Sequence, residues 1–212
     1  MNIIIFGANG KTGRELIAQG LKQGHSITAF VRDSAQLNIV DKNLKVVKGE
    51  VTDYGQINKA VKANNYDAAF SVLGAKGMFK RDLLLMDAMK NIIKALEENG
   101  VDKLIHVSFI GVRKDAGKLG FLYKFIIPHF MKNLLLDHSE KDALLKKSSL
   151  NWTLVQPPVL TADAFTGRYM HEVEIHKNKS HKLKLSRANL ANFMLKSLNN
   201  QTYDRKEVFI TE

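Results

Sequence analysis

The first half of the chain alternates between short apolar runs and longer stretches in which apolar residues recur every three or four positions. The short runs predict buried strands, and the longer stretches predict amphipathic helices. The predicted strands span residues 2–6, 26–31, 45–48, 67–72 and 101–108, and the predicted helices span residues 11–23, 54–63 and 82–98, the last capped by Asp82. Strands and helices in this order predict a parallel sheet with helices on both faces.

The second half has a less regular pattern. Its predicted elements are a mostly helical stretch over 119–147 interrupted near Pro128, a strand over 151–156, extra strands over 169–175 and 182–185, a helix over 187–199 capped by Ser186, and a strand over 208–211. No linker or repeat divides the chain, so one domain over residues 1–212 is expected. Residues 157–185 are expected to form a small extension on the substrate side.

Three glycines follow the first predicted strand at intervals of three residues. A strand that ends in such a loop and continues into a helix predicts a site for the pyrophosphate of a dinucleotide. The residues expected to bind it are Gly7, Asn9, Gly10, Lys11, Thr12 and Gly13. A phosphate-loop NTPase is disfavoured, because its motif needs a glycine where this chain has Ile5.

Residues that follow the other strands are expected to complete the dinucleotide site. Arg32 favours NADP, since an arginine there can pair with the 2′-phosphate, although the next residue, Asp33, leaves NAD open. Arg32 would otherwise be an ordinary solvated cation. Glu50 and Val51 either contact the adenine or form an ordinary turn. The further candidates at strand ends are Leu73, Gly74, Ala75, Ser108 and Phe109.

Composition limits the classes of function that remain. The chain has 212 residues, 45% of them hydrophobic, and no cysteine, so thiolate metal sites and cysteine nucleophiles are excluded. No set of His, Asp or Glu has the spacing of a metal site, so no metal is expected. No apolar run is long enough to cross a bilayer, and neither a membrane partner nor a signal peptide is expected. A cytoplasmic location follows as an expectation.

Two segments have alternative interpretations. Residues 119–136 are the most apolar stretch, and we expect a core helix there rather than a flap over an acceptor. The net charge of +11 attracts anions, and the basic stretch 176–187 could contact nucleic acid. In that stretch Lys182 and Lys184 alternate with Leu183 and Leu185, which favours an edge strand instead. Nucleic acid is therefore not the expected partner.

These features together resemble the atypical short-chain dehydrogenase/reductases, in particular the branch that holds biliverdin-IXβ reductase, also called flavin reductase. Besides the glycine loop, the residues that carry the resemblance are Val31-Arg32-Asp33, Asp102-Lys103, Ser149-Leu150, Pro157-Pro158, Thr166-Gly167-Arg168-Tyr169 and Asn192-Phe193-Met194-Leu195. The resemblance implies an α/β, single-domain Rossmann fold with a doubly wound, mostly parallel sheet. It also implies that Ser108, Phe109, His138, Pro157 and Pro158 lie near the nicotinamide, with Ser108 and His138 as catalytic candidates.

The chain departs from the family at the general acid. His138 stands where better-known relatives have the lysine of a Tyr-x-x-x-Lys pair, and Leu134 stands at the tyrosine position. Leucine cannot donate a proton, so the usual alcohol dehydrogenation is disfavoured. Phe109 and Val159 replace a serine and a histidine of biliverdin-IXβ reductase, which disfavours biliverdin as the substrate.

The expected function is therefore an NAD(P)H-dependent reductase that prefers NADPH and transfers hydride to a planar, flavin-like or quinone-like acceptor. Flavin is expected as a substrate and not as a bound cofactor. The alternative is a regulatory protein that senses the NADP redox state without turnover. The chain is expected to be a monomer or a homodimer.

Overall fold

A parallel sheet with a reversal in its strand order forms the centre of the molecule. The computed structural model describes residues 1–34, 37, 39–74, 77, 81–176 and 181–212. Within these residues eight strands pair in the order β3-β2-β1-β4-β5-β6-β10-β8. The strands are β1 (Asn2–Phe6), β2 (Ser26–Val31), β3 (Leu44–Lys48), β4 (Ala68–Ser71), β5 (Lys103–Val107), β6 (Asn151–Gln156), β8 (Met170–Glu172) and β10 (Lys206–Thr211). All pairings are parallel except that of β10 with β8.

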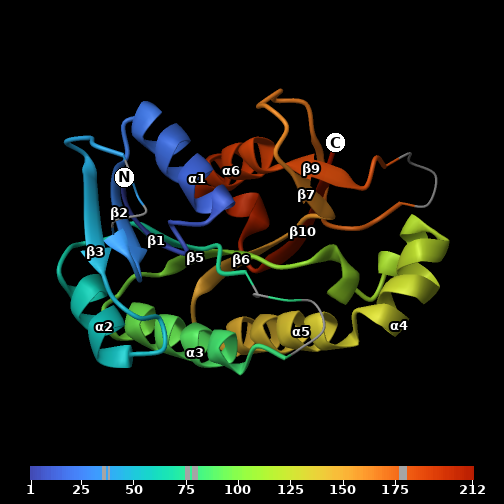
Figure 1. Ribbon diagram of the computed structural model, residues 1–212, viewed down its shortest axis with the longest axis horizontal. Helices are drawn as coiled ribbons and strands as arrows, with labels where there is room; N and C mark the ends of the chain where they lie inside the picture. The colour runs from blue at the N-terminus through green and yellow to red at the C-terminus, as the bar shows by residue number, and fades with distance from the viewer. Residues whose placement is uncertain (35–36, 38, 75–76, 78–80, 177–180) are drawn as a thin grey trace.

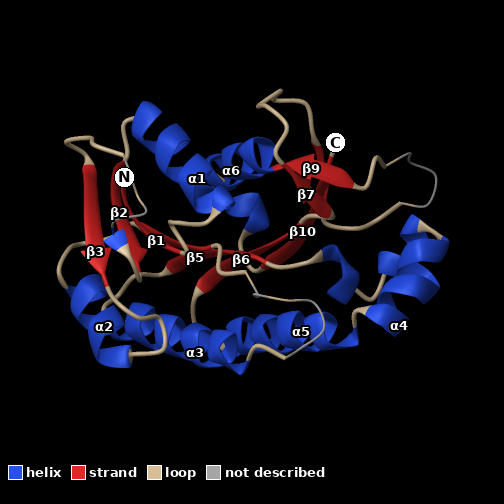
Figure 2. Cartoon of the chain, in the orientation of Figure 1, coloured by secondary structure: helices blue, strands red, loops and turns tan. Residues whose placement is uncertain are grey.

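Helices cover both faces of this sheet (Figures 1 and 2). The helices are α1 (Lys11–Lys22), α2 (Tyr54–Lys62), α3 (Leu83–Glu98), α4 (Ile127–Phe130), α5 (Lys132–Lys147) and α6 (Arg187–Lys196). Helices α1 and α6 lie together on one face, and α2, α3 and α5 lie on the other. The fold is thus a single Rossmann-like α/β domain, as the sequence predicts.

Two apolar layers hold the helices to the sheet. On the α1–α6 face, Ile17 and Met194 pack with residues of the central strands, and each is fully buried. On the opposite face, Ile92 and Leu145 do the same. Each such side chain contributes about 1.5–3 kcal/mol when it is removed from water. The central strands β1 and β4 are apolar on both sides because both of their faces are covered.

The strand order reverses between β2 and β4, which pair with opposite edges of β1. Ligands of open α/β sheets bind in the crevice at such a point, beyond the carboxyl ends of the strands. The glycine loop that follows β1 lies there.

The second half differs from the sequence prediction in several details. Pro128 does not interrupt the helical path, since it lies in the first turn of α4, where a missing N–H is tolerated. The break falls at Met131, after a π-helical turn, Leu122–Ile126. Asp82 precedes α3 but makes no capping side-chain hydrogen bond. The three-residue strand β7 (Val159–Thr161) was not predicted.

The stretch 182–185 forms strand β9 (Lys184–Ser186), which pairs with β7. Leu185 is buried and Lys184 is exposed, as the alternation predicts. Within the basic stretch, residues 177–180 fall outside the described residues. The core-helix interpretation of residues 119–136 is wrong for most of residues 121–130, where Tyr123 and Ile127 are buried and the other side chains are exposed.

Candidate functional site

The glycine loop joins β1 to α1 so tightly that neither Gly7 nor Gly13 has room for a Cβ. Gly7 has a φ of +90°, and a Cβ there would lie 2.9 Å from the backbone of Val72 on the neighbouring strand. A Cβ on Gly13 would lie 2.4 Å from the carbonyl oxygen of Gly7. The first turn of α1 begins after Gly10 with no side-chain cap and no acidic residue. Its free N–H groups and the helix dipole therefore favour an anion at this point.

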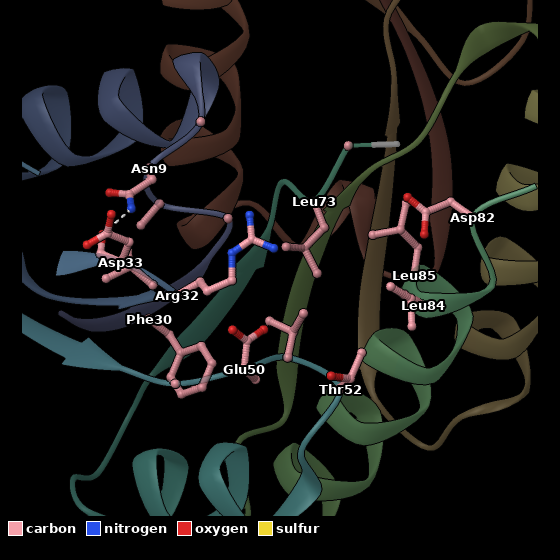
Figure 3. A pocket seen from close by; sticks show the side chains of 17 residues that line it. Asn9, Phe30, Arg32, Asp33, Glu50, Thr52, Leu73, Asp82, Leu84 and Leu85 are labelled. Atoms are coloured by element: carbon pink, nitrogen blue, oxygen red, sulfur yellow. Dashed lines mark hydrogen bonds between the residues drawn. The ribbon is translucent and has the colours of Figure 1, made fainter. Parts of the chain in front are cut away.

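A cavity of about 260 Å³ lies beside this loop (Figure 3). Its walls come from the loop and from the residues that follow β2, β3 and β4. They include Gly7, Asn9, Gly10, Arg32, Glu50, Val51, Leu73 and Gly74. In Figure 3 the guanidinium of Arg32 points into the cavity toward Leu73, and the carboxylate of Glu50 lies on the same side. The described lining therefore presents the cation of Arg32 and the acceptor oxygens of Glu50 to a ligand.

Asn9 fixes the shape of this cavity. Its Nδ2 donates a hydrogen bond to the carbonyl oxygen of Asp33 over 2.6 Å. This bond ties the glycine loop to the end of β2, next to Arg32. Its Oδ1 is buried without a partner among the described residues, which leaves an acceptor for a ligand group.

A second cavity, of about 220 Å³, adjoins the first. Both are lined by Leu73 and Gly74, so the two form one groove across the carboxyl ends of the central strands. The other residues that line the second cavity are Thr12, Val72, Val107, Ser108, Phe109, Leu134, His138, Pro157, Pro158 and Leu160. Mostly apolar walls with three polar side chains, those of Thr12, Ser108 and His138, suit a planar ring.

Ser108 connects the second cavity to a buried acid. Its Oγ donates a hydrogen bond to Oδ2 of Asp142 over 2.6 Å. Asp142 is 2% exposed, and burial raises its pKa to about 6, against the opposing effect of the Ser108 hydrogen bond. The pair can therefore hold or release a proton near neutral pH.

His138 lies on the same face of α5 as Asp142, one turn earlier. Its ring centroid is 6.1 Å from that of Phe109. Burial lowers the pKa of His138 to about 3, and the nearby charge of Lys141 acts in the same direction. His138 is thus a neutral imidazole at physiological pH, and its Nδ1 has no partner in the described part of the chain.

More polar groups lie buried behind this wall. Lys141 is 1% exposed, and burial lowers its pKa while the carboxylates of Asp142 and Asp137 oppose that shift. His106 is fully buried, and its Nδ1 lies 3.1 Å from Oγ of Ser71. Burial also lowers the pKa of His106 well below its usual value. Lys141, the carboxyl group of Asp142 and the neutral His106 thus share the interior behind His138.

An ion-pair clasp fixes α5 against the start of α3. Arg81 pairs with both Asp137 and Glu140. The backbone N–H of Asp82 donates to Oδ2 of Asp137 over 2.8 Å. The clasp therefore holds the chain just before α3 against the helix that presents His138.

Most of the residues predicted for the site line one of the two cavities. Lys11 and Gly13 do not line either, because Lys11 points to solvent from α1 and Gly13 packs under the loop. Ala75 lies outside the described residues. Sequence reasoning missed Asp142. The spacing of Leu134, His138 and Asp142, four residues apart on one helix, was the signal that could have found it.

The described residues contain neither a candidate metal site nor a candidate membrane-spanning helix. No group of three or more His, Asp or Glu side chains could hold a metal ion. No helix in the described ranges is long and apolar enough to cross a membrane.

The switch point, the glycine loop and the uncapped helix define a dinucleotide-binding Rossmann protein. Comparison with known protein families agrees with this class, since the family model described as NAD(P)H-binding matches residues 7–201. The chain therefore belongs to the NAD(P)H-binding family. The family match confirms the NAD(P)H-binding family that the sequence predicts, and the solved neighbours confirm its Rossmann fold.

Individual relatives support the fold over its full length. The UPF0659 protein YMR090W of Saccharomyces cerevisiae is 28% identical over 93% of this chain and 87% of its own. A short-chain dehydrogenase/reductase from Veillonella parvula, solved in complex with NADP, has a TM-score of 0.79 and 21% identity over 100% of this chain and 94% of its own. ChuY, an anaerobillin reductase from Escherichia coli O157:H7, has a TM-score of 0.76 and 19% identity over 100% of this chain and 97% of its own. At these identities, the two solved structures are evidence of fold.

Proposed function

We propose that this protein is an NADPH-dependent reductase of planar aromatic acceptors such as flavins and quinones. The observation that carries the proposal is the pair of adjoining cavities, of which the second contains a hydroxyl bonded to a buried acid. The first would hold the adenosine half of the coenzyme, and the second would hold its nicotinamide together with the acceptor. Residues 157–185 would border the acceptor side.

The preference for NADPH rests on charge. Arg32 points into the first cavity and can pair with a 2′-phosphate through two parallel hydrogen bonds. The N–H groups at the start of α1 would hold the pyrophosphate. The net charge of +11 adds a general attraction for a coenzyme with several phosphates.

The choice of acceptor rests on the walls of the second cavity. Leu134 lines it at the position of the tyrosine in family members that reduce carbonyls, so the acceptor must not depend on a phenol. Bound NADPH supplies a hydride. Phe109 and the two prolines would orient a flat ring and exclude water.

Ser108 and Asp142 would deliver the accompanying proton. When Asp142 is protonated, the carboxylic acid donates to Oγ of Ser108, whose own proton then passes to the reduced acceptor. A flavin or quinone needs one proton with the hydride, so the balance is complete. His138, as a neutral imidazole, would hydrogen-bond the acceptor or the coenzyme amide.

Steady-state oxidation of NADPH with a panel of flavins and quinones tests the proposal. Turnover with at least one acceptor is expected, and the rate is expected to fall as the pH rises through about 6, because the protonated Asp142 is the donor. Tight binding of NADPH with no turnover would reject the reductase and favour the coenzyme-sensing alternative.

Variants of Ser108 and Asp142, with a buried serine elsewhere as the control, separate an effect on catalysis from an effect on folding. Ser108→Ala and Asp142→Asn should each lower kcat by about 10²-fold, the low end of the range for a general acid, with the KM for NADPH unchanged. Ser197→Ala is the control, since this buried hydroxyl bonds to the carbonyl oxygen of Phe193 on the opposite face of the sheet. An equal loss of activity in the control would point to a structural effect.

A further inference from the structure

An exposed apolar surface lies at one end of the molecule, away from the cavity beside the glycine loop. We define this surface by five side chains on the π-helical turn and α4: Phe121, Leu122, Phe125, Ile126 and Phe130, which are 70%, 48%, 51%, 37% and 64% exposed. Figure 1 shows α4 at the end of the chain's long axis, beyond the edge of the sheet. Five large apolar side chains exposed within ten residues mark an interaction site.

The surface is rigidly mounted on the domain. Tyr123 and Ile127, four residues apart, are 4% and 7% exposed and pack into a small core with Phe209 of β10. Because these two residues turn inward, the residues between and around them turn outward. The rings of Phe121 and Phe125 lie 5.1 Å apart, so they form one continuous patch.

Lysines accompany the patch along the chain. The sequence from Ala116 to Leu136 contains Lys118, Lys124 and Lys132 and no aspartate or glutamate. Nζ of Lys124 lies 5.1 Å from the ring centroid of Phe125. A short helical segment with exposed aromatic residues and flanking lysines fits a partner that is both apolar and anionic.

We propose that this surface docks on an anionic lipid bilayer, with the phenylalanines inserted at the headgroup level and the lysines at the lipid phosphates. A second copy of the chain is disfavoured as the occupant, because it would bring the same lysines face to face. The inference revises the sequence expectation of no membrane partner. It goes beyond the proposed reductase function and does not depend on it.

Flotation of the full chain with lipid vesicles tests the proposal. Vesicles of phosphatidylcholine with phosphatidylglycerol should bind the protein, and vesicles of phosphatidylcholine alone should bind it much more weakly. Added salt should weaken binding, since exposed charges are screened. The Phe121→Ser/Phe125→Ser variant should bind about tenfold or more weakly. The Lys124→Glu/Lys132→Glu variant should lose the preference for anionic lipid.

The control variant is Phe165→Ser, which changes a phenylalanine that is 54% exposed elsewhere on the chain and should bind like the wild type. Equal thermal melting of all variants establishes that they fold. Equal binding to both vesicle types, or undiminished binding by Phe121→Ser/Phe125→Ser, would overturn the proposal. The proposal would also be overturned if the wild type bound no vesicles and instead formed a dimer in sedimentation velocity that Phe121→Ser/Phe125→Ser abolishes.

Discussion

The buried imidazole of His138 makes the stability of the protein depend on pH. Its pKa is about 3 in the folded chain and 6.5 when unperturbed, so the unfolded chain binds more protons between these values. Stability from this site is therefore fully present above pH 6.5 and is lost as the pH falls toward 3. At about 1.36 kcal/mol per pKa unit, the loss reaches about 2 kcal/mol at pH 5 and about 5 kcal/mol below pH 3.

The variant His138→Gln keeps a polar side chain but cannot take up a proton in this range. Urea unfolding at pH 7 and pH 5 measures the free energy of unfolding of both proteins. Between these pH values the wild type should lose about 2 kcal/mol more than His138→Gln. His129→Gln, which changes an exposed histidine, should follow the wild type. Equal slopes for the wild type and His138→Gln would show that burial does not keep this imidazole neutral.

Three further outcomes are expected. At Asp142 the stability should change with pH in the opposite direction, because the pKa of this carboxyl is raised from 3.8 to about 6. In the same unfolding assay, the wild type should lose about 3 kcal/mol of stability relative to Asp142→Asn as the pH rises from 4 to 7. Arg32→Ala should weaken NADPH about 10- to 100-fold and NADH little, by isothermal calorimetry, and an equal loss for both coenzymes would contradict the role given to this cation. Gly13→Ala should lower stability by about 1–3 kcal/mol and abolish coenzyme binding, because the new Cβ would overlap the loop backbone. The control Gly55→Ala should do neither, because its Cβ would meet only Oδ1 of Asp53, at 3.3 Å.

The coenzyme half of the site could be predicted because its determinants are local. A glycine loop needs its glycines at fixed positions after a strand, and Arg32 and Glu50 follow strand ends that the apolar pattern marks clearly. Parallel strands bring these ends together at one edge of the sheet. Strand ends therefore predicted contacts between residues that are far apart in the sequence.

The second cavity could be predicted only in part. Ser108 and Asp142 meet across 34 positions, and the helical spacing that places Asp142 on the face of His138 does not reveal that this acid meets Ser108. The exposed face of residues 121–130 was also hidden, since an apolar composition does not reveal which side chains a π-helical turn directs outward. The first feature depends on how α5 packs and the second on how the π-helical turn and α4 pack against Phe209, and both are tertiary properties.

The clasp at Arg81 has a consequence for the release of a bound coenzyme. Asp82, Leu84 and Leu85, at the start of α3, line the first cavity, and Arg81 holds this end of α3 to α5. Ligand release that requires this wall to move must strain or break the two ion pairs of Arg81, one with the buried carboxylate of Asp137 and one with the more exposed carboxylate of Glu140. Arg81 is thus placed to govern how long a coenzyme resides on the protein, while the sheet beneath it stays intact.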